Sequence, residues 1–297
     1  MGEGGDGGSG KLGNYDGSAA APYLPAASAK CKEPLLISSC GLKLKLKILV
    51  YHQIVSGDSY HGDYPWAVTV SQLRRHLELL REWGFKTISF KDYSAYTGGA
   101  TVLPNRCVIL TFDDGYEEMY QNALTLLMEF GAKATFFVLG DRSLGINNWD
   151  HKRGFDRMNL IEDHKLIEMH NAGYEVGSHS MTHPVLTEVS TELAEKEIRD
   201  SKSLLENLVQ EEVTTFAYPH GATNDFVKKI VEAAGYSYGC GVYSGPPKFG
   251  GDMYDIRRIP MTRRTNAIEF ALKMMTPYEH YAWLRWEAGK RLRGFAG

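Results

Sequence analysis

The chain has 297 residues, 43% of them hydrophobic, which is enough to bury the core of one large domain or two small ones. Its net charge of −3 is small and no basic stripe stands out, so the sequence gives no support to a nucleic-acid partner. The four cysteines form no C-x-x-C pair, which argues against a disulfide framework and a cysteine zinc site. No apolar stretch approaches the roughly 20 residues of a membrane span.

Residues 1–41 are predicted to form a tail outside the folded domain. Up to Lys32 they are rich in Gly, Ala, Ser and Pro, a composition typical of disordered segments. The basic start and long apolar centre of a secretory signal peptide are missing. We interpret Cys40 as an ordinary cysteine ahead of the first strand, because the apolar run before it is too short for a lipoprotein signal.

From residue 42 onward, strand-like and helix-like segments alternate. Apolar residues alternate with lysines over residues 42–51, which predicts a half-buried strand. Leucines at helical spacing predict a helix over residues 70–83 that ends at Gly84. Residues 85–89 are short and strand-like, and residues 107–112 form an apolar run typical of a core strand in a parallel sheet.

The same alternation continues through the second half. The helices expected there cover residues 118–130, 159–172, 190–209 and 225–234. The strands expected there cover residues 134–138, 175–178, 215–218, 238–243 and 254–259. Seven or eight strand–helix units in series favour a parallel sheet closed, or nearly closed, into a barrel. We therefore expect a single α/β domain over residues 42–275.

Residues 276–297 are aromatic and basic and are predicted to form an amphipathic helix. The residues at helical spacing are Tyr278, Tyr281, Leu284, Ala288 and Leu292, and the basic residues elsewhere are Arg285, Lys290, Arg291 and Arg293. One interpretation is a helix that lies in a membrane interface. We favour the other, a helix that packs on the barrel or fills a groove of a protein partner.

Two adjacent carboxylates, Asp113 and Asp114, end the central apolar strand. Because neighbouring acids repel each other, such a pair usually binds a cation or has one raised pKa. The pattern predicts one metal ligand beside one general base. His179 and His183 directly follow the strand predicted over residues 175–178. Two imidazoles four residues apart can bind one ion. Active sites of α/β barrels lie at the carboxyl ends of the strands, so the joint placement favours a metal site over a turn and a solvated histidine pair.

Two other strand ends carry polar groups. Residues 216–221 contain Pro219 and Gly221, which predict a tight turn whose backbone N–H groups can face the site; a plain strand-to-helix turn is the alternative. His52 ends the first strand, where it could protonate a leaving group or simply bond to a neighbour. The histidines without such placement are expected on the surface: His61, His76, His151, His164, His170 and His280.

Together these motifs resemble the polysaccharide deacetylase family, also called the NodB-homology or carbohydrate esterase family 4 enzymes. The matching segments are residues 111–115, 179–183 and 216–221, and the likeness spans roughly residues 46–265. The resemblance implies a distorted (β/α) barrel of about seven strands. It also implies a divalent metal ion, most commonly zinc, with cobalt and nickel as alternatives. Members that act on polymers are usually exported, although this sequence contains no clear export signal.

The resemblance also implies a role for each residue. The metal ligands would be Asp114, His179 and His183, and the catalytic base would be Asp113. The substrate-binding turn would be Tyr218, Pro219, His220 and Gly221, with the backbone N–H of His220 on the oxyanion. The reaction would be removal of N-acetyl groups from an N-acetylglucosamine-containing polysaccharide or oligosaccharide, with release of acetate.

Two departures from the family pattern point to one branch of it. Many members have an arginine that contacts the base where this chain has Ala217, and many have a late leucine-x-histidine motif that is missing here. Both departures are similar to the circularly permuted branch that deacetylates poly-N-acetylglucosamine, as are residues 72–89 and 148–150. In that branch the acid follows an early tyrosine, which matches His52. Either Arg257 or Arg258 would replace the missing arginine.

Three alternatives stay open at this point. Two histidines and one carboxylate also suit a non-haem iron oxygenase, although that chemistry does not need Asp113. A second is a related C–N hydrolase that acts on a small amide or a cyclic ureide. The third is a carbohydrate-binding domain with a dead catalytic site, which Ala217 would explain.

Overall fold

The structure is a computed structural model that describes residues 35–37, 43–57, 64–151, 154–242 and 251–294. These residues belong to the second of two units of the chain, Cys31–Gly297, and the first unit, Met1–Lys30, lies outside them. The predicted tail is therefore almost entirely outside the described residues. The same is true of His61 and Cys40.

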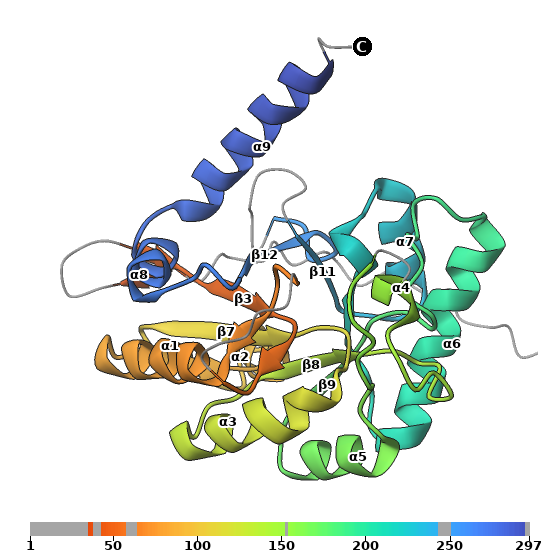
Figure 1. Ribbon diagram of the computed structural model, residues 1–297, viewed down its shortest axis with the longest axis horizontal. Coiled ribbons are helices and arrows are strands. Elements are labelled where there is room, and N and C mark those ends of the chain that lie inside the picture. Colours follow the sequence, from red (N-terminus) through yellow and green to blue (C-terminus); the bar gives the residue numbers. More distant parts are fainter. Residues whose placement is uncertain (1–34, 38–42, 58–63, 152–153, 243–250, 295–297) are drawn as a thin grey trace, which may run out of the picture. The chain divides into compact units, whose positions relative to one another are not determined.

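Within the described residues, seven parallel strands close into a barrel (Figure 1). In ring order they are β3 (Lys47–Tyr51), β7 (Cys107–Phe112), β8 (Thr135–Val138), β9 (Glu175–Ser178), β10 (Thr215–Ala217), β11 (Tyr238–Val242) and β12 (Ile256–Pro260). The ring closes because β3 pairs with β12 on one side and with β7 on the other. A further parallel strand, β6 (Lys86–Ile88), pairs with the first half of β7. The expected (β/α) barrel of about seven strands is confirmed.

Helices follow most of the strands (Figure 1). They are α1 (Val70–Glu82), α2 (Phe90–Thr97), α3 (Leu124–Phe130), α4 (Asn148–His151), α5 (Asp163–Asn171), α6 (Thr191–Val209), α7 (Asp225–Ala233), α8 (Ala267–Met275) and α9 (Tyr278–Gly294). The described structure also contains two pairs of short strands: β1 (Leu35–Ile37) with β2 (Lys43–Lys45), and β4 (Ile54–Val55) with β5 (Val68–Thr69). Among the described helices, none is both long enough and apolar enough to cross a membrane.

One helix begins later than its sequence pattern predicts. We expected a helix over residues 159–172, but α5 begins only at Asp163. The two residues at 159–160 instead form β-bridges with Ile146 and Tyr116. A loop is therefore held against the carboxyl end of the barrel where helix was expected.

The sequence pattern did not predict α2, which covers the amino-terminal end of the barrel. Its Phe90 and Tyr93 belong to one buried apolar cluster with Cys107 and Tyr238, which begin two of the strands. The buried carboxylate of Glu175, at the start of β9, accepts a hydrogen bond from the backbone N–H of Phe90 at 2.8 Å. Because the amino-terminal end is filled in this way, the carboxyl end of the barrel is the one available for a site.

The first barrel strand is fully buried, so the expectation of a half-buried strand is wrong for β3. Even Lys47 is only 7% exposed. Its Nζ donates to the carbonyl oxygens of Lys273 and Thr276, both at 2.7 Å, and pairs with Glu279 at 2.8 Å. Carbonyl groups at a helix end lack partners within the helix, so this lysine satisfies the end of α8 and ties the first turn of α9 to the barrel.

His76 is buried, which contradicts the prediction that it lies on the surface. It is 1% exposed and lies on the inner face of α1, where it stacks on Phe270 with ring centroids 4.2 Å apart. Its Nε2 lies 2.9 Å from the carbonyl oxygen of Thr265, so Nε2–H donates there, and Nδ1 accepts from the hydroxyl of Tyr51 at 3.2 Å. Both ring nitrogens are thus satisfied by the neutral imidazole.

This environment predicts an acid-sensitive contribution to stability. Burial lowers the pKa of His76 to about 4 and outweighs the hydrogen bond to Thr265, which raises it; the charge of Lys273 lowers it slightly further. A folded-state pKa below the unfolded value of about 6.5 means that the folded chain binds fewer protons. The contribution is therefore complete above about pH 6.5 and is lost as the pH falls through about 4. We expect His76→Gln to reduce this acid loss by about 3 kcal/mol, measured by urea unfolding at pH 7 and pH 4. An unchanged pH dependence in the variant would contradict the assignment.

Candidate functional site

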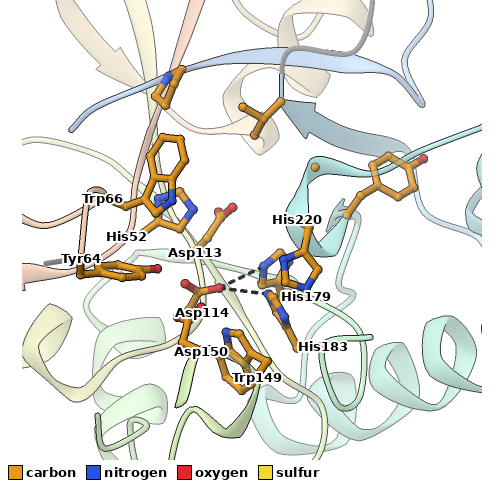
Figure 2. Close-up of a pocket in the computed structure, with 14 residues that line it drawn as sticks. His52, Tyr64, Trp66, Asp113, Asp114, Trp149, Asp150, His179, His183 and His220 are labelled. Atoms are coloured by element: carbon orange, nitrogen blue, oxygen red, sulfur yellow. Dashed lines mark ion pairs between the residues drawn. The ribbon is translucent and has the colours of Figure 1, made fainter. Parts of the chain in front are cut away.

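A pocket opens at the carboxyl end of the barrel and collects the polar residues that end the strands (Figure 2). Its lining residues are His52, Tyr64, Trp66, Asp113, Asp114, Trp149, Asp150, His179, His183, Tyr218, His220, Gly221, Val242 and Pro260. The two aspartates and the four histidines predicted for the site therefore meet in one cavity. They come from four segments that are far apart in the sequence.

Asp113 and Asp114 both reach the pocket because the backbone leaves the strand conformation between them. In a regular strand, neighbouring side chains point to opposite faces. Asp114 has a left-handed backbone, with φ of 75°, which breaks this alternation. Gly115 follows with φ of 71°, and a Cβ atom there would lie 3.2 Å from the side chain of Val138. The Asp-Asp-Gly sequence is thus the local reason that two adjacent carboxylates share one cavity.

Asp114, His179 and His183 form a compact buried cluster. Nε2 of each histidine lies 3.3 Å from Oδ1 of Asp114, and the three donor atoms lie within 4.8 Å of one another. Nδ1 of His179 lies 2.7 Å from the carbonyl oxygen of Ala217, a contact that requires a proton on Nδ1. The other nitrogen, Nε2, is therefore the one that faces the carboxylate.

The electrostatics of the cluster fit a divalent cation. Burial alone would raise the pKa of Asp114, but its contacts with His179 and His183 hold that pKa well below its ordinary value. Burial lowers the pKa of His183 to about 4, so its imidazole is neutral at pH 7, the form that binds metals. The contact with Asp114 raises the pKa of His179 despite burial, so a cation would compete there with a proton. No lysine or arginine among the described residues forms an ion pair with Asp114. Zinc prefers donor sets of this kind: two imidazoles and one carboxylate, with one imidazole oriented by a hydrogen bond to a backbone carbonyl.

Asp113, which follows β7, is paired with Arg258 of β12. These two strands flank β3 on opposite sides. Nη1 and Nη2 of the arginine donate to Oδ1 and Oδ2 of Asp113, both at 2.6 Å. Nη1 also lies 3.1 Å from the hydroxyl of Thr111, and Arg258 is 2% exposed. Burial would raise the pKa of Asp113, but the Arg258 guanidinium in first place, with His179, holds it below its ordinary value. Arg257, the other candidate, pairs with Asp255 instead.

His52 and His220 lie on opposite sides of Asp113 (Figure 2). His52 follows β3, and its ring lies 5.5 Å from that of Trp66. Its Nδ1 is buried and has no hydrogen-bond partner among the described residues. An imidazole held by packing, with a nitrogen that no protein group occupies, can exchange a proton with a bound molecule.

The turn after β10, residues 218–221, lies at the rim of the cluster. The N–H groups of Tyr218 and Gly221 donate to the carbonyl oxygens of Cys240 and Tyr218, both at 2.9 Å, and Pro219 has no N–H. His220, the residue named in the oxyanion prediction, has a φ of 58°, and its ring lies 4.6 Å from that of His183. Pro219 shapes the turn and is not among the residues that line the pocket, whereas Tyr218 is.

Six lining residues were not predicted for the site: Tyr64, Trp66, Trp149, Asp150, Val242 and Pro260. The ring of Trp149 stacks on His183 with centroids 4.4 Å apart. Asp150 accepts a hydrogen bond from the hydroxyl of Tyr116 at 2.5 Å, and burial together with Asp114 raises the pKa of Asp150. The available signal was the position of these residues at strand ends or in loops that follow strands, where barrel sites are built.

Comparison with known proteins agrees with this geometry. The sequence profile of the family described as "Polysaccharide deacetylase" matches residues 101–239. YxkH of Bacillus subtilis (strain 168), which is assigned to the polysaccharide deacetylases, is 32% identical over 215 residues. That alignment covers 72% of this chain and 71% of YxkH.

Two other proteins extend the likeness. The poly-beta-1,6-N-acetyl-D-glucosamine N-deacetylase of Staphylococcus aureus (strain MRSA252) is 26% identical over 183 residues, which cover 59% of this chain and 60% of that enzyme. In fold, the chain is similar to the Streptococcus pyogenes deacetylase PplD, solved in complex with acetate. The TM-score is 0.65 at 22% identity, over 77% of this chain and 97% of that structure. The chain belongs to the polysaccharide deacetylase family.

Proposed function

We propose that this protein removes N-acetyl groups from an N-acetylglucosamine-containing polysaccharide or oligosaccharide and releases acetate. The observation that carries the proposal is the pairing, in one pocket, of the Asp114–His179–His183 cluster with a separate buried carboxylate, Asp113. The Staphylococcus aureus relative, a poly-beta-1,6-N-acetyl-D-glucosamine N-deacetylase, supports the substrate class. A binding domain without catalysis would have no use for an ionised base beside a cation site.

Asp114, His179 and His183 would hold the cation, for which zinc is the best match to the donor set. When bound there, such an ion would lower the pKa of a water molecule to about 7 and polarise the acetamide carbonyl. All other steps depend on the protein's own residues.

Asp113 would act as the base that takes a proton from the attacking water. Its low pKa keeps it ionised, and each of its oxygens retains a lone pair beyond the one used by Arg258. Arg258 would fix the orientation of the carboxylate, which is the role that the missing arginine at Ala217 has elsewhere in the family. The two-point contact with a planar guanidinium gives a defined geometry that a lysine could not provide.

The backbone N–H of His220 would donate to the oxyanion that forms as water adds to the acetamide carbon. His52, in its protonated form, would then donate to the sugar nitrogen as the carbon–nitrogen bond breaks. The products are acetate and a free amino sugar. Because His52 and His220 lie on opposite sides of Asp113, the leaving nitrogen and the oxyanion would receive their hydrogen bonds from opposite sides of the pocket.

The proposal is tested by acetate release from N-acetylglucosamine oligomers of increasing length, with chelator and then added zinc. We expect release that rises with chain length, stops with chelator and returns with zinc. Faster turnover of a small amide or a cyclic ureide would favour the related hydrolase. Oligomer binding without acetate release would favour a carbohydrate-binding domain, and a requirement for oxygen would favour an iron oxygenase.

A further inference from the structure

The loop that carries both histidines of the cluster has an unusual backbone. Two of its non-glycine residues are left-handed: Ser180, with φ of 66°, and His183 itself, with φ of 65°. A residue in this region costs about 1–3 kcal/mol and persists only where its surroundings determine it. The position of His183 therefore depends on contacts made by its neighbours in the loop.

The first part of the loop is held by backbone groups. The N–H of Gly140 donates to the carbonyl oxygen of Ser180 at 2.9 Å, and the N–H of Asp141 donates to that of Met181 at 3.1 Å. These contacts tether the loop to the segment after β8. They end at residue 181, two positions before His183.

The residue just before His183 is held by a side chain of α6. The backbone N–H of Thr182 donates to Oε2 of Glu197 at 2.8 Å, and the Thr182 hydroxyl donates to Oε1 at 2.6 Å. Glu197 is only 4% exposed and lies on the inner face of α6 beside Ile198. No described lysine or arginine forms an ion pair with it. A buried carboxylate is costly unless its hydrogen bonds are satisfied, and here both partners belong to one residue of the loop.

At Gly140, α6 packs tightly against the segment after β8 and against the histidine loop. A Cβ atom on Gly140 would lie 2.6 Å from Cα of Ser201, on α6, and 2.7 Å from Sδ of Met181, in the loop. The helix and the loop are therefore in direct contact at Gly140. A shift of α6 or a loss of the Glu197 contact would be transmitted to the loop, because interiors packed at this density do not absorb displacement.

We propose that Glu197 is a positioning residue of the metal site. Glu197 accepts hydrogen bonds from the backbone N–H and the hydroxyl of Thr182. It thereby keeps His183 in the left-handed conformation that brings Nε2 to Asp114. The inference rests on the proposed function only in requiring that the cluster bind a cation. Partners that orient a metal ligand from behind typically change metal affinity by about 10–100-fold when removed.

Zinc affinity, measured by competition with a chromogenic chelator, tests the proposal in four single variants. Glu197→Ala loses both contacts, and we expect its zinc affinity to fall by about 10–100-fold. Thr182→Val keeps the backbone contact and Glu197→Gln keeps one acceptor, so both should show smaller losses. Glu195→Ala removes an exposed glutamate from the same helix and should bind zinc as the wild type does. A Glu197→Ala/Thr182→Val double variant should bind no more weakly than Glu197→Ala, since both changes break the same contact.

Thr182→Val and Glu197→Gln keep the test valid if Glu197→Ala does not fold. Wild-type zinc affinity in every folded variant, even with a lowered unfolding temperature, would overturn the inference and leave Glu197 a purely structural residue. Failure of the wild-type chain itself to bind zinc would overturn the proposed function, and the inference with it.

Discussion

Replacing His183 by alanine is expected to abolish zinc binding and acetate release together. The change removes one of three donors, and Nε2 of His183 lies 3.3 Å from the carboxylate that would share the ion. The remaining imidazole and carboxylate cannot hold the ion in a defined geometry, so activity should fall by about 10³-fold or more. The measurements are bound zinc by elemental analysis and acetate release from an N-acetylglucosamine oligomer.

The matched control is His164→Ala, which removes an exposed histidine of α5. It should leave zinc content and acetate release unchanged. Full activity of His183→Ala, or loss of activity with zinc still bound at the wild-type level, would contradict the assignment of His183 as a ligand.

Asp113→Asn should separate the base from the metal site. An amide cannot take a proton from water, so acetate release is expected to fall by about 10²–10⁴-fold. Zinc binding should survive, because Asp113 is not part of the donor cluster and the three donors come from other residues. The measurements are zinc affinity and the rate of acetate release on the same preparation.

The Asn variant needs a stability control, because Arg258 would lose its counter-charge. Breaking a buried ion pair from one side costs about 3–5 kcal/mol. In Asp113→Asn/Arg258→Met both charges are gone, and stability should largely recover while activity stays low. If the double variant releases acetate at the wild-type rate, Asp113 is not the base. If Asp113→Asn loses zinc, the two aspartates do not have separate roles.

Much of the fold follows from periodic segments whose burial can be inferred locally. The apolar run of β7 and the amphipathic α1 and α6 lie within one or two residues of their predicted bounds. The failures involve partners that are distant in the sequence. Lys47 contacts a carbonyl 226 residues away, and His76 contacts one 189 residues away. No local pattern predicts that a lysine or a histidine will find such a partner.

The site was more predictable than its surroundings, since the carboxyl ends of parallel strands converge. This rule is enough to bring Asp113, Asp114, His179, His183 and His52 into one pocket. The rule does not decide which of two adjacent arginines, Arg257 or Arg258, contacts Asp113.

Residues next to each other on a strand face opposite sides, so the choice between Arg257 and Arg258 depends on the register of β12. Two pairings set that register: Arg258 lies opposite Val242 of β11, and Ile259 lies opposite Leu49 of β3. The sequence alone therefore could not assign the arginine.

The closure of the ring between β3 and β12 has a consequence for how the protein is made. His52 follows the first barrel strand and Arg258 lies in the last, so the proposed acid and the partner of the proposed base are separated by most of the domain. A nascent chain has no complete pocket until β12 has left the ribosome and paired with β3. Fragments that end before Ile256 should be unable to hydrolyse substrate, whatever structure they form. Catalytic competence would then arise late in biosynthesis and in one step, as the slow, long-range pairing that closes a barrel is completed.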